Sequence, residues 1–101
     1  MDAVNASIIP IIVTFNPDKK TLLTILQGLL AQAKTVIVVD NGSNSPIDAM
    51  LQNLPIPDQH NVRLIAFEQN FGLGKAYNAG ITLARRLKVA FVLLMDHDSI
   101  P

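Results

Sequence analysis

Four short apolar runs separated by helix-like segments constrain this chain more than any other feature. The runs cover residues 8–15, 35–39, 62–67 and 89–95. Continuous apolar runs of this length, rich in β-branched residues, are typical of strands that are buried on both faces. Their regular alternation with helical segments predicts a βαβαβαβ order, which forms a parallel sheet with right-handed crossovers. The sequence therefore predicts an α/β fold with a Rossmann-like, mostly parallel sheet.

Individual residues set the expected limits of these elements. Pro10 cannot donate a hydrogen bond to a strand ladder, so the well-paired part of the first strand is expected from Ile11. Asn16 and Pro17 are suited to the N-cap and the first position of the following helix. Arg63 predicts an edge position for the third strand. The wholly apolar fourth strand predicts a central position.

Two further segments complete the expected order of elements. A short helix is predicted from residue 46 to residue 54, and residues 55–61 are predicted to form a loop because they contain two prolines. A longer helix is expected to end near Lys88, with cationic side chains in its last turn.

Composition excludes several classes of protein. The 101 residues suffice for one domain, and half of them are hydrophobic, which argues against a disordered tail. Eight basic and eight acidic residues give a formal net charge of zero, which argues against a nucleic-acid partner. Without cysteine there is no disulfide and no thiolate metal site. No basic leader and no membrane-spanning apolar run is present, so a cytoplasmic location is expected.

Polar residues follow every predicted strand. The carboxyl ends of parallel strands meet at one edge of a sheet, where ligands of open α/β folds bind. We therefore expect these residues to form a single ligand site. The candidates, in chain order, are Thr14, Phe15, Asn16, Asp40, Asn41, Gly42, Asn70, Gly72, Gly74, Lys75, Asn78, Asp96 and Asp98.

Some of these candidates also have a simpler structural interpretation. The Gly72-Leu73-Gly74-Lys75 segment departs from a Walker loop and from a dinucleotide fingerprint, and its glycines can simply allow a tight helix start. The functional alternative is that Asn70, Lys75 or Asn78 faces a ligand. Asp40 is either a turn residue or a carboxylate that accepts a ligand hydrogen bond. Phe15 is either a core residue or a stacking face for a base.

The pair Asp96 and Asp98 directly follows the fourth apolar run. Carboxylate oxygens suit Mg²⁺ or Mn²⁺, which commonly bridges a protein carboxylate to substrate phosphates. A carboxylate turn or cap is the simpler alternative. A phosphotransferase pattern is disfavoured because position 100 is Ile rather than Thr or Val.

As a set, four motifs resemble family 2 glycosyltransferases, which are inverting enzymes of the GT-A fold. The motifs are Val13-Thr14-Phe15-Asn16, Val38-Val39-Asp40-Asn41-Gly42-Ser43, the segment from Asn70 to Gly80, and Leu94-Met95-Asp96-His97-Asp98-Ser99. The second and fourth motifs resemble the rhamnosyltransferase branch in particular. The resemblance implies that residues 1–101 form the N-terminal, nucleotide-sugar-binding part of a GT-A domain.

The resemblance also implies roles for single residues. Thr14 and Phe15 would border the nucleotide base, and Asp40 would accept a hydrogen bond from the base imide. Residues 70–78 would line the nucleotide pocket. Asp96 would contact the ribose, or the metal through water, and Asp98 would bind the Mg²⁺ or Mn²⁺ that holds the diphosphate. The donor would be dTDP-rhamnose or a UDP-sugar.

Family members continue well past the Asp-x-Asp turn, and that part supplies the acceptor site and the general base. We therefore expect the general base beyond Pro101, and a chain that binds donor without transferring sugar. The fourth strand would then have an open edge, so self-association through residues 89–95 is expected. The alternatives are a non-catalytic α/β interaction module and another nucleotide-binding enzyme, such as a nucleotidyltransferase.

Overall fold

A four-stranded parallel sheet forms the centre of the molecule. The computed structural model describes residues 8–96. The strands are β1 (Ile8–Thr14), β2 (Val36–Asp40), β3 (Val62–Ala66) and β4 (Phe91–Asp96), in the spatial order β3-β2-β1-β4. All three neighbouring pairs are parallel. The predicted α/β fold with a parallel sheet is confirmed.

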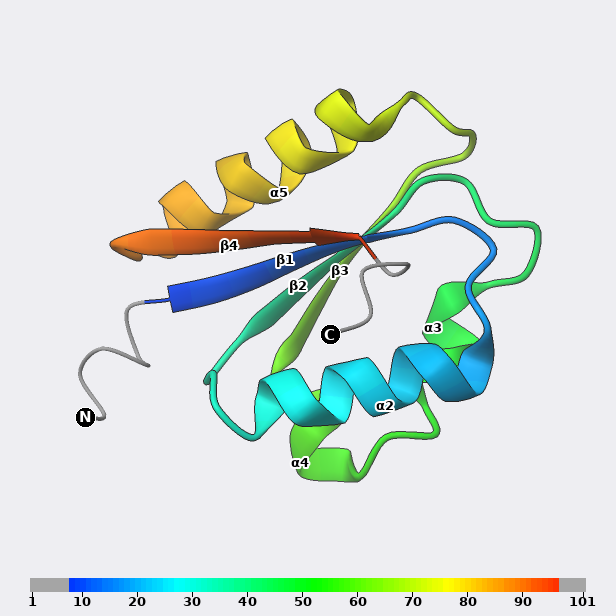
Figure 1. Ribbon diagram of the computed structural model, residues 1–101, viewed down its shortest axis with the longest axis horizontal. Helices are drawn as coiled ribbons and strands as arrows, with labels where there is room; N and C mark the ends of the chain where they lie inside the picture. Colours follow the sequence, from blue (N-terminus) through cyan, green and yellow to red (C-terminus); the bar gives the residue numbers. More distant parts are fainter. Residues whose placement is uncertain (1–7, 97–101) are drawn as a thin grey trace.

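Helices cover both faces of this sheet (Figure 1). They are α2 (Lys19–Leu30), α3 (Ile47–Leu51), α4 (Ile56–Gln59) and α5 (Leu73–Arg86). Helix α5 lies alone on one face, and α2 lies with α3 and α4 on the opposite side. Side chains of a strand alternate between the two faces, so each strand serves two cores. Ile12 and Val38 pack with α2, whereas Ile11 and Val39 pack with α5.

Helix α5 lies very close to the sheet because small residues form its inner face. Ala76, Gly80 and Ala84 are its buried residues. A Cβ atom added at Gly80 would lie 2.5 Å from Cγ2 of Ile11. The close approach holds the helix start beside the strand ends that carry the polar residues.

The first helix begins two residues later than predicted. Its N-cap is Asp18, whose Oδ2 accepts a hydrogen bond from the Thr21 backbone N–H at 2.9 Å. Asn16 instead has a positive φ of 49° and accepts the Asn44 backbone N–H through Oδ1 at 2.8 Å. The prediction of Asn16 as N-cap is wrong because its side chain is engaged by a distant loop.

The segment that follows β2 also differs from the prediction. Helix α3 ends at Leu51, and α4 occupies part of residues 55–61, where a loop was predicted. Pro55 caps α4 and Pro57 lies in its first turn, where the missing proline N–H costs no intrahelical bond.

Pro10 lies within β1 and costs no ladder hydrogen bond. Pairing with β2 begins at Ile11, as predicted, whereas pairing with β4 already begins at Ile8. The Thr14 carbonyl accepts the Asn41 N–H on the β2 side. Backbone groups of alternate residues in a parallel strand face the same neighbouring strand. Pro10 lies four residues before Thr14, so its backbone also faces β2, but the pairing with β2 begins only after Pro10.

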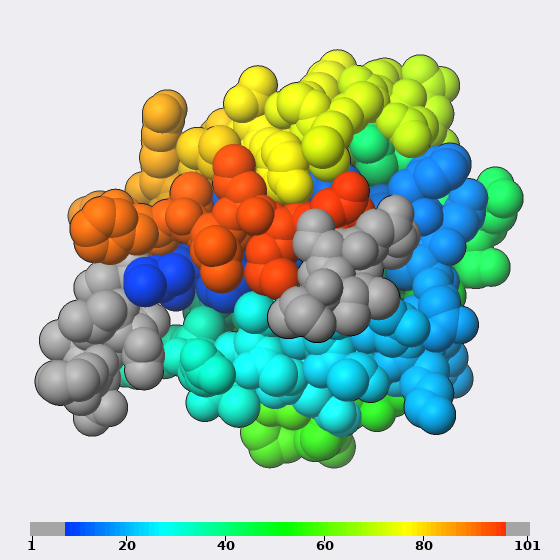
Figure 2. Space-filling view, viewed as in Figure 1, coloured from blue at the N-terminus to red at the C-terminus, as the bar shows by residue number. Residues whose placement is uncertain are grey.

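Strand β4 lies at an edge of the sheet within residues 8–96, which agrees with the expected open edge and corrects the central position that its apolar composition alone predicts. The edge position of β3 is confirmed. Four apolar side chains of β4 remain 37 to 66% exposed, namely Phe91, Val92, Leu93 and Leu94. Figure 2 shows β4 at the molecular surface between α5 and α2. Strand composition therefore predicted a buried strand, but no described segment covers it.

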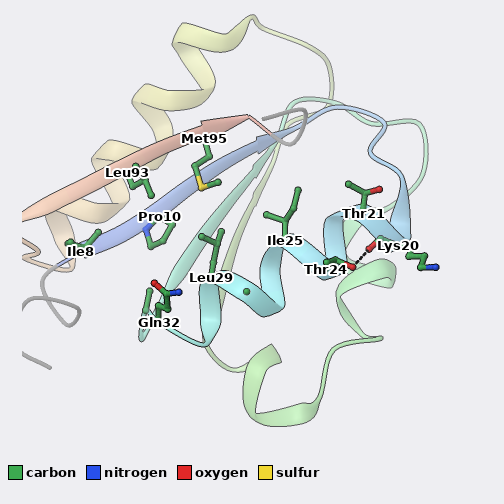
Figure 3. A pocket seen from close by; sticks show the side chains of 12 residues that line it. Ile8, Pro10, Lys20, Thr21, Thr24, Ile25, Leu29, Gln32, Leu93 and Met95 are labelled. Carbon is green, nitrogen blue, oxygen red and sulfur yellow. Dashed lines mark hydrogen bonds between the residues drawn. The ribbon is translucent and has the colours of Figure 1, made fainter. Parts of the chain in front are cut away.

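An apolar groove runs along the same edge. Its volume is about 720 Å³, and it lies between α2 and the strands β1 and β4. Figure 3 shows Leu93 and Met95 on one side of the groove and Ile25 and Leu29 on the other. Gly28 also lines the groove, and an added Cβ there would meet nothing within 4 Å.

Candidate functional site

A second, more polar pocket lies at the carboxyl ends of the strands. Its volume is about 390 Å³. It is lined by residues from the ends of β1, β2 and β4 and from the segment between β3 and α5, namely Val13, Thr14, Phe15, Asn41, Asn70, Gly72, Leu73 and Asp96. Six of these eight were candidates from the sequence, and Val13 and Leu73 were not. The expected convergence of strand ends is therefore present for these six.

Asp40 lies beside the pocket but does not line it. The residue is only 4% exposed. Its Oδ1 accepts hydrogen bonds from the Thr14 hydroxyl at 2.7 Å and the Ser43 hydroxyl at 2.6 Å. Its Oδ2 accepts the Ser43 backbone N–H at 2.9 Å. Three donors of the protein thus satisfy this buried carboxylate and fix the turn that follows β2.

The loops after β1 and β2 are joined through Asn16 and Ser43. The Asn16 backbone N–H donates to the Ser43 hydroxyl at 2.7 Å. Ser43 in turn donates to Asp40, so one chain of hydrogen bonds runs from the β1 end to the β2 end. Asn16 belongs to this framework and does not line the pocket.

The loop after β3 is packed against the loop after β2. Gly42 has a φ of +86°, and an added Cβ would lie 2.4 Å from the Gln69 carbonyl carbon. Next to it, Asn41 Oδ1 accepts the Phe71 backbone N–H at 2.9 Å. Gly42 therefore contributes through a close backbone approach, and only glycine fits that approach without displacing a loop.

The glycine segment forms one wall of the pocket and starts α5. Gly72 has a φ of +90°, and its N–H donates to Asn70 Oδ1 at 2.8 Å. Phe71 packs edge-on against Phe67, with ring centroids 5.4 Å apart. The Lys75 ammonium lies 4.2 Å from the centre of the Phe71 ring, a cation–π contact.

Three candidates from this segment lie outside the pocket. Gly74, Lys75 and Asn78 are exposed on α5 and do not line it. Their proposed contacts with a ligand remain predictions.

Among residues 8–96, Asp96 is the carboxylate that lines the pocket, and it lies at the end of β4. Burial, and then the negative charge of Asp96, raise the pKa of the Tyr77 phenol, so this hydroxyl stays protonated at neutral pH. Within residues 8–96 no three His, Cys, Asp or Glu side chains gather into a metal-binding group. Asp98, the second carboxylate of the predicted metal pair, lies outside the described residues. A Mg²⁺ ion commonly takes one or two protein carboxylates and completes its shell with phosphate and water, and Asp96 fits that role.

The sequence of the chain is similar to a known enzyme family over almost its whole length. The sequence model of glycosyl transferase family 2 matches residues 10–101. The chain belongs to glycosyl transferase family 2. It is 33% identical over 95 residues to the dTDP-rhamnosyl transferase RfbF of Shigella flexneri, which agrees with the rhamnosyltransferase branch of the family.

The extent of this match limits what can be inferred about this chain from its relative. The aligned part covers 94% of the chain but 30% of the length of the Shigella relative. No solved structure matches the chain significantly. None of the helices within residues 8–96 is long and apolar enough to cross a membrane. Family membership therefore identifies the family and the type of fold.

Sequence reasoning missed Ser43 as part of the site framework. The signal was the spacing in Asp40-Asn41-Gly42-Ser43, since an Asp side chain commonly accepts the backbone N–H of a residue shortly after it in a turn. The contribution of Thr14 to the same carboxylate becomes visible only once β1 and β2 are in register, with Thr14 beside Asp40.

Proposed function

We propose that this chain is the donor-binding part of an inverting, metal-dependent family 2 glycosyltransferase. The donor is a nucleoside diphosphate sugar, either dTDP-rhamnose or a UDP-sugar. The observation that supports this most directly is the polar pocket at the strand ends, which combines an exposed aromatic face, amide groups and the Asp96 carboxylate. Family membership supplies the reaction class.

The residues of the pocket suit the two halves of such a donor. Phe15 is 42% exposed at the pocket rim and offers a face on which a base can stack. Asp96, with Asp98, would hold a Mg²⁺ or Mn²⁺ ion against the diphosphate. Bound there, the ion would stabilise the negative charge that develops on the leaving nucleoside diphosphate. Gly72 and Leu73, at the start of α5, are exposed and line the same pocket.

The acceptor site and the general base are proposed to lie beyond Pro101. The chain spans 30% of the length of its Shigella relative, which leaves room for both in a full-length enzyme. The acceptor would be a glycan or a lipid-linked glycan. As a 101-residue polypeptide, the chain is expected to bind donor nucleotide without transferring sugar.

Calorimetry tests this proposal with few components. UDP and dTDP are titrated into the chain with and without MnCl₂, and an Asp96→Ala variant is compared with Asp48→Ala, which removes a carboxylate from α3 outside the pocket. We expect Mn²⁺-dependent binding that is lost in Asp96→Ala and kept in Asp48→Ala. Failure of every nucleotide to bind would favour an interaction module, and a preference for triphosphates would favour a nucleotidyltransferase. Acceptor-dependent release of nucleoside diphosphate would contradict the proposal that this chain binds the donor without transferring sugar.

The uncovered edge of β4 is proposed to associate with a second copy of the chain. Lys88 precedes this strand and Asp96 ends it. Antiparallel pairing centred on Val92 would bring the basic end of each copy to the acidic end of the other, whereas parallel pairing would place like charges together. The same arrangement would pair the open main-chain edge of β4 and bring the exposed apolar side chains of the two copies next to one another.

A further inference from the structure

The charges of the chain are divided between the two ends of the sheet, although its formal net charge is zero. Four exposed cations lie where strands begin: Lys34 precedes β2, and Arg85, Arg86 and Lys88 lie between the last turn of α5 and β4. Figure 1 shows the end of α2 that leads into β2 and the end of α5 that leads into β4 at the same end of the molecule. Phe91, the first residue of β4, also lies there and is 66% exposed. These five residues are called the amino-end patch.

Acidic residues gather at the opposite end of the sheet. Within residues 8–96, they lie at the end of a strand, in the loop after it or in the first turn of the next helix, with Asp58 of α4 as the exception. They are Asp18, Asp40, Asp48, Glu68 and Asp96. Positive and negative charges are therefore separated along the strands, and such a separation can attract a charged surface even when the net charge is zero.

Lys88 occupies a position that ordinarily favours glycine. It follows Leu87, the C-cap of α5, and its φ of 59° lies in the left-handed region. Glycine is the usual residue at this position because it has no Cβ. The conformation of the turn therefore does not account for a lysine here.

We propose that the amino-end patch binds the surface of a membrane that contains anionic lipids. Clustered Lys and Arg side chains are attracted to such a surface, and an exposed aromatic ring suits the boundary between headgroups and acyl chains. Val92 and Leu93, next along β4, are also exposed. Aliphatic surface beside the cations favours a membrane over a nucleic acid, which is bound through its phosphates and stacked bases.

The position of the patch is compatible with the other proposals. It lies where the strands begin, whereas the polar pocket lies at their carboxyl ends, so a membrane bound at the patch leaves the pocket accessible. Arg85 and Arg86 belong to α5, so the proposal does not require β4 to be unpaired.

Flotation with vesicles in a density gradient tests the role of the cations. The chain is mixed with vesicles of phosphatidylcholine alone, or of equimolar phosphatidylcholine and phosphatidylglycerol. We expect binding to the mixed vesicles only, and its loss in about 0.5 M NaCl, which screens exposed charges.

A matched pair of double variants locates the binding end. Arg85→Gln with Arg86→Gln is compared with Lys19→Gln and Lys20→Gln, which remove the same charge from adjacent residues in the first turn of α2. Thermal unfolding checks that both variants are folded. We expect the arginine variant to bind the mixed vesicles about tenfold more weakly or worse, and the lysine variant to stay within about twofold of the unsubstituted chain.

A fluorescent reporter gives a second measurement. The chain contains no tryptophan, so Phe91→Trp and Phe71→Trp each introduce a single indole, one in the patch and one at the opposite end of the sheet. Phe71 is 43% exposed, so both rings start in contact with water. With the mixed vesicles, we expect the emission of Phe91→Trp to shift to the blue as its ring enters the headgroup region, and that of Phe71→Trp to stay unchanged.

The proposal is overturned if the chain does not float with the mixed vesicles, or if the two double variants bind them equally. It is overturned equally if the emission of Phe71→Trp shifts and that of Phe91→Trp does not. Binding of a single-stranded oligonucleotide without flotation would assign the patch to a nucleic acid instead. None of these results depends on nucleotide binding, so they leave the proposed function to its own test.

Discussion

Alanine substitutions at three glycines can distinguish backbone strain from a collision between the pocket loops. Gly72 and Gly42 both have positive φ, of +90° and +86°. At Gly72 an added Cβ would meet nothing within 4 Å, whereas at Gly42 it would meet backbone atoms of Gln69 and Asn70 at 2.4 to 2.7 Å. Alanine at Gly72 therefore tests backbone strain alone, and alanine at Gly42 tests strain together with a collision between two loops.

The expected magnitudes follow from these geometries. Backbone strain at a glycine-only conformation costs about 1–3 kcal/mol, which is the expected loss for Gly72→Ala. At Gly42 the loops must also separate, which endangers the hydrogen bond between the Asn41 side chain and the Phe71 N–H and adds about 1–3 kcal/mol. Gly28 lies in α2 with open space around it, so Gly28→Ala should raise the free energy of unfolding by up to about 1 kcal/mol.

Urea or thermal unfolding followed by circular dichroism measures the series. Each kcal/mol corresponds to roughly 4–8 °C in Tm for a domain of this size. From highest to lowest, the expected order of Tm is Gly28→Ala, the unsubstituted chain, Gly72→Ala and Gly42→Ala. Equal Tm values for Gly42→Ala and Gly72→Ala would refute the claim that the loops after β2 and β3 are in obligatory backbone contact.

Three further predictions concern the framework and the open edge. Hydrogen bonds from the Thr21 backbone and then from its side chain lower the pKa of Asp18, so its contribution to stability is present above the ordinary Asp pKa of 3.8 and is lost as the pH falls through the lowered value. Between about pH 5 and pH 2, the free energy of unfolding should therefore fall less for Asp18→Asn than for the unsubstituted chain. An unchanged pH profile in the variant would contradict the role of Asp18 as a cap. Asp40→Asn removes the acceptor of the part-buried Ser43 backbone N–H and should cost about 1 kcal/mol in urea unfolding, and no loss would show that this hydrogen bond is dispensable. Leu93→Lys should shift the chain toward monomer in sedimentation, whereas Ile56→Lys, at an exposed site on α4, should not; equal shifts would argue against pairing through β4.

The sheet was predictable because its signals are local and repeated. Apolar runs of strand length identify the strands, and their alternation with helices requires parallel pairing. Parallel pairing alone then brings Thr14, Asn41 and Asp96 to one edge, whatever their exact contacts. The candidate site could thus be located from sequence to the level of the strand ends.

Contacts between distant segments could not be predicted in the same way. Asn16 and Asp18 are both good helix caps, and the choice between them depends on Asn44, which is 28 residues from Asn16. The hydrogen bond from Thr14 to the buried Asp40 depends on the register of β1 and β2, which places the two residues side by side. The open edge of β4 was expected from the family resemblance, whereas the composition of the strand alone predicts a central position.

Mapping the bound nucleotide on the chain tests the central claim most directly. The ¹⁵N-labelled chain is titrated with UDP and MgCl₂, and the backbone amide shifts are followed by NMR. We expect the largest shifts at the ends of β1, β2 and β4 and at the start of α5, namely at Phe15, Asn41, Gly72, Leu73 and Asp96. Shifts centred on the groove between α2 and β4, or no saturable shifts at the strand ends, would contradict a nucleotide pocket at this edge of the sheet.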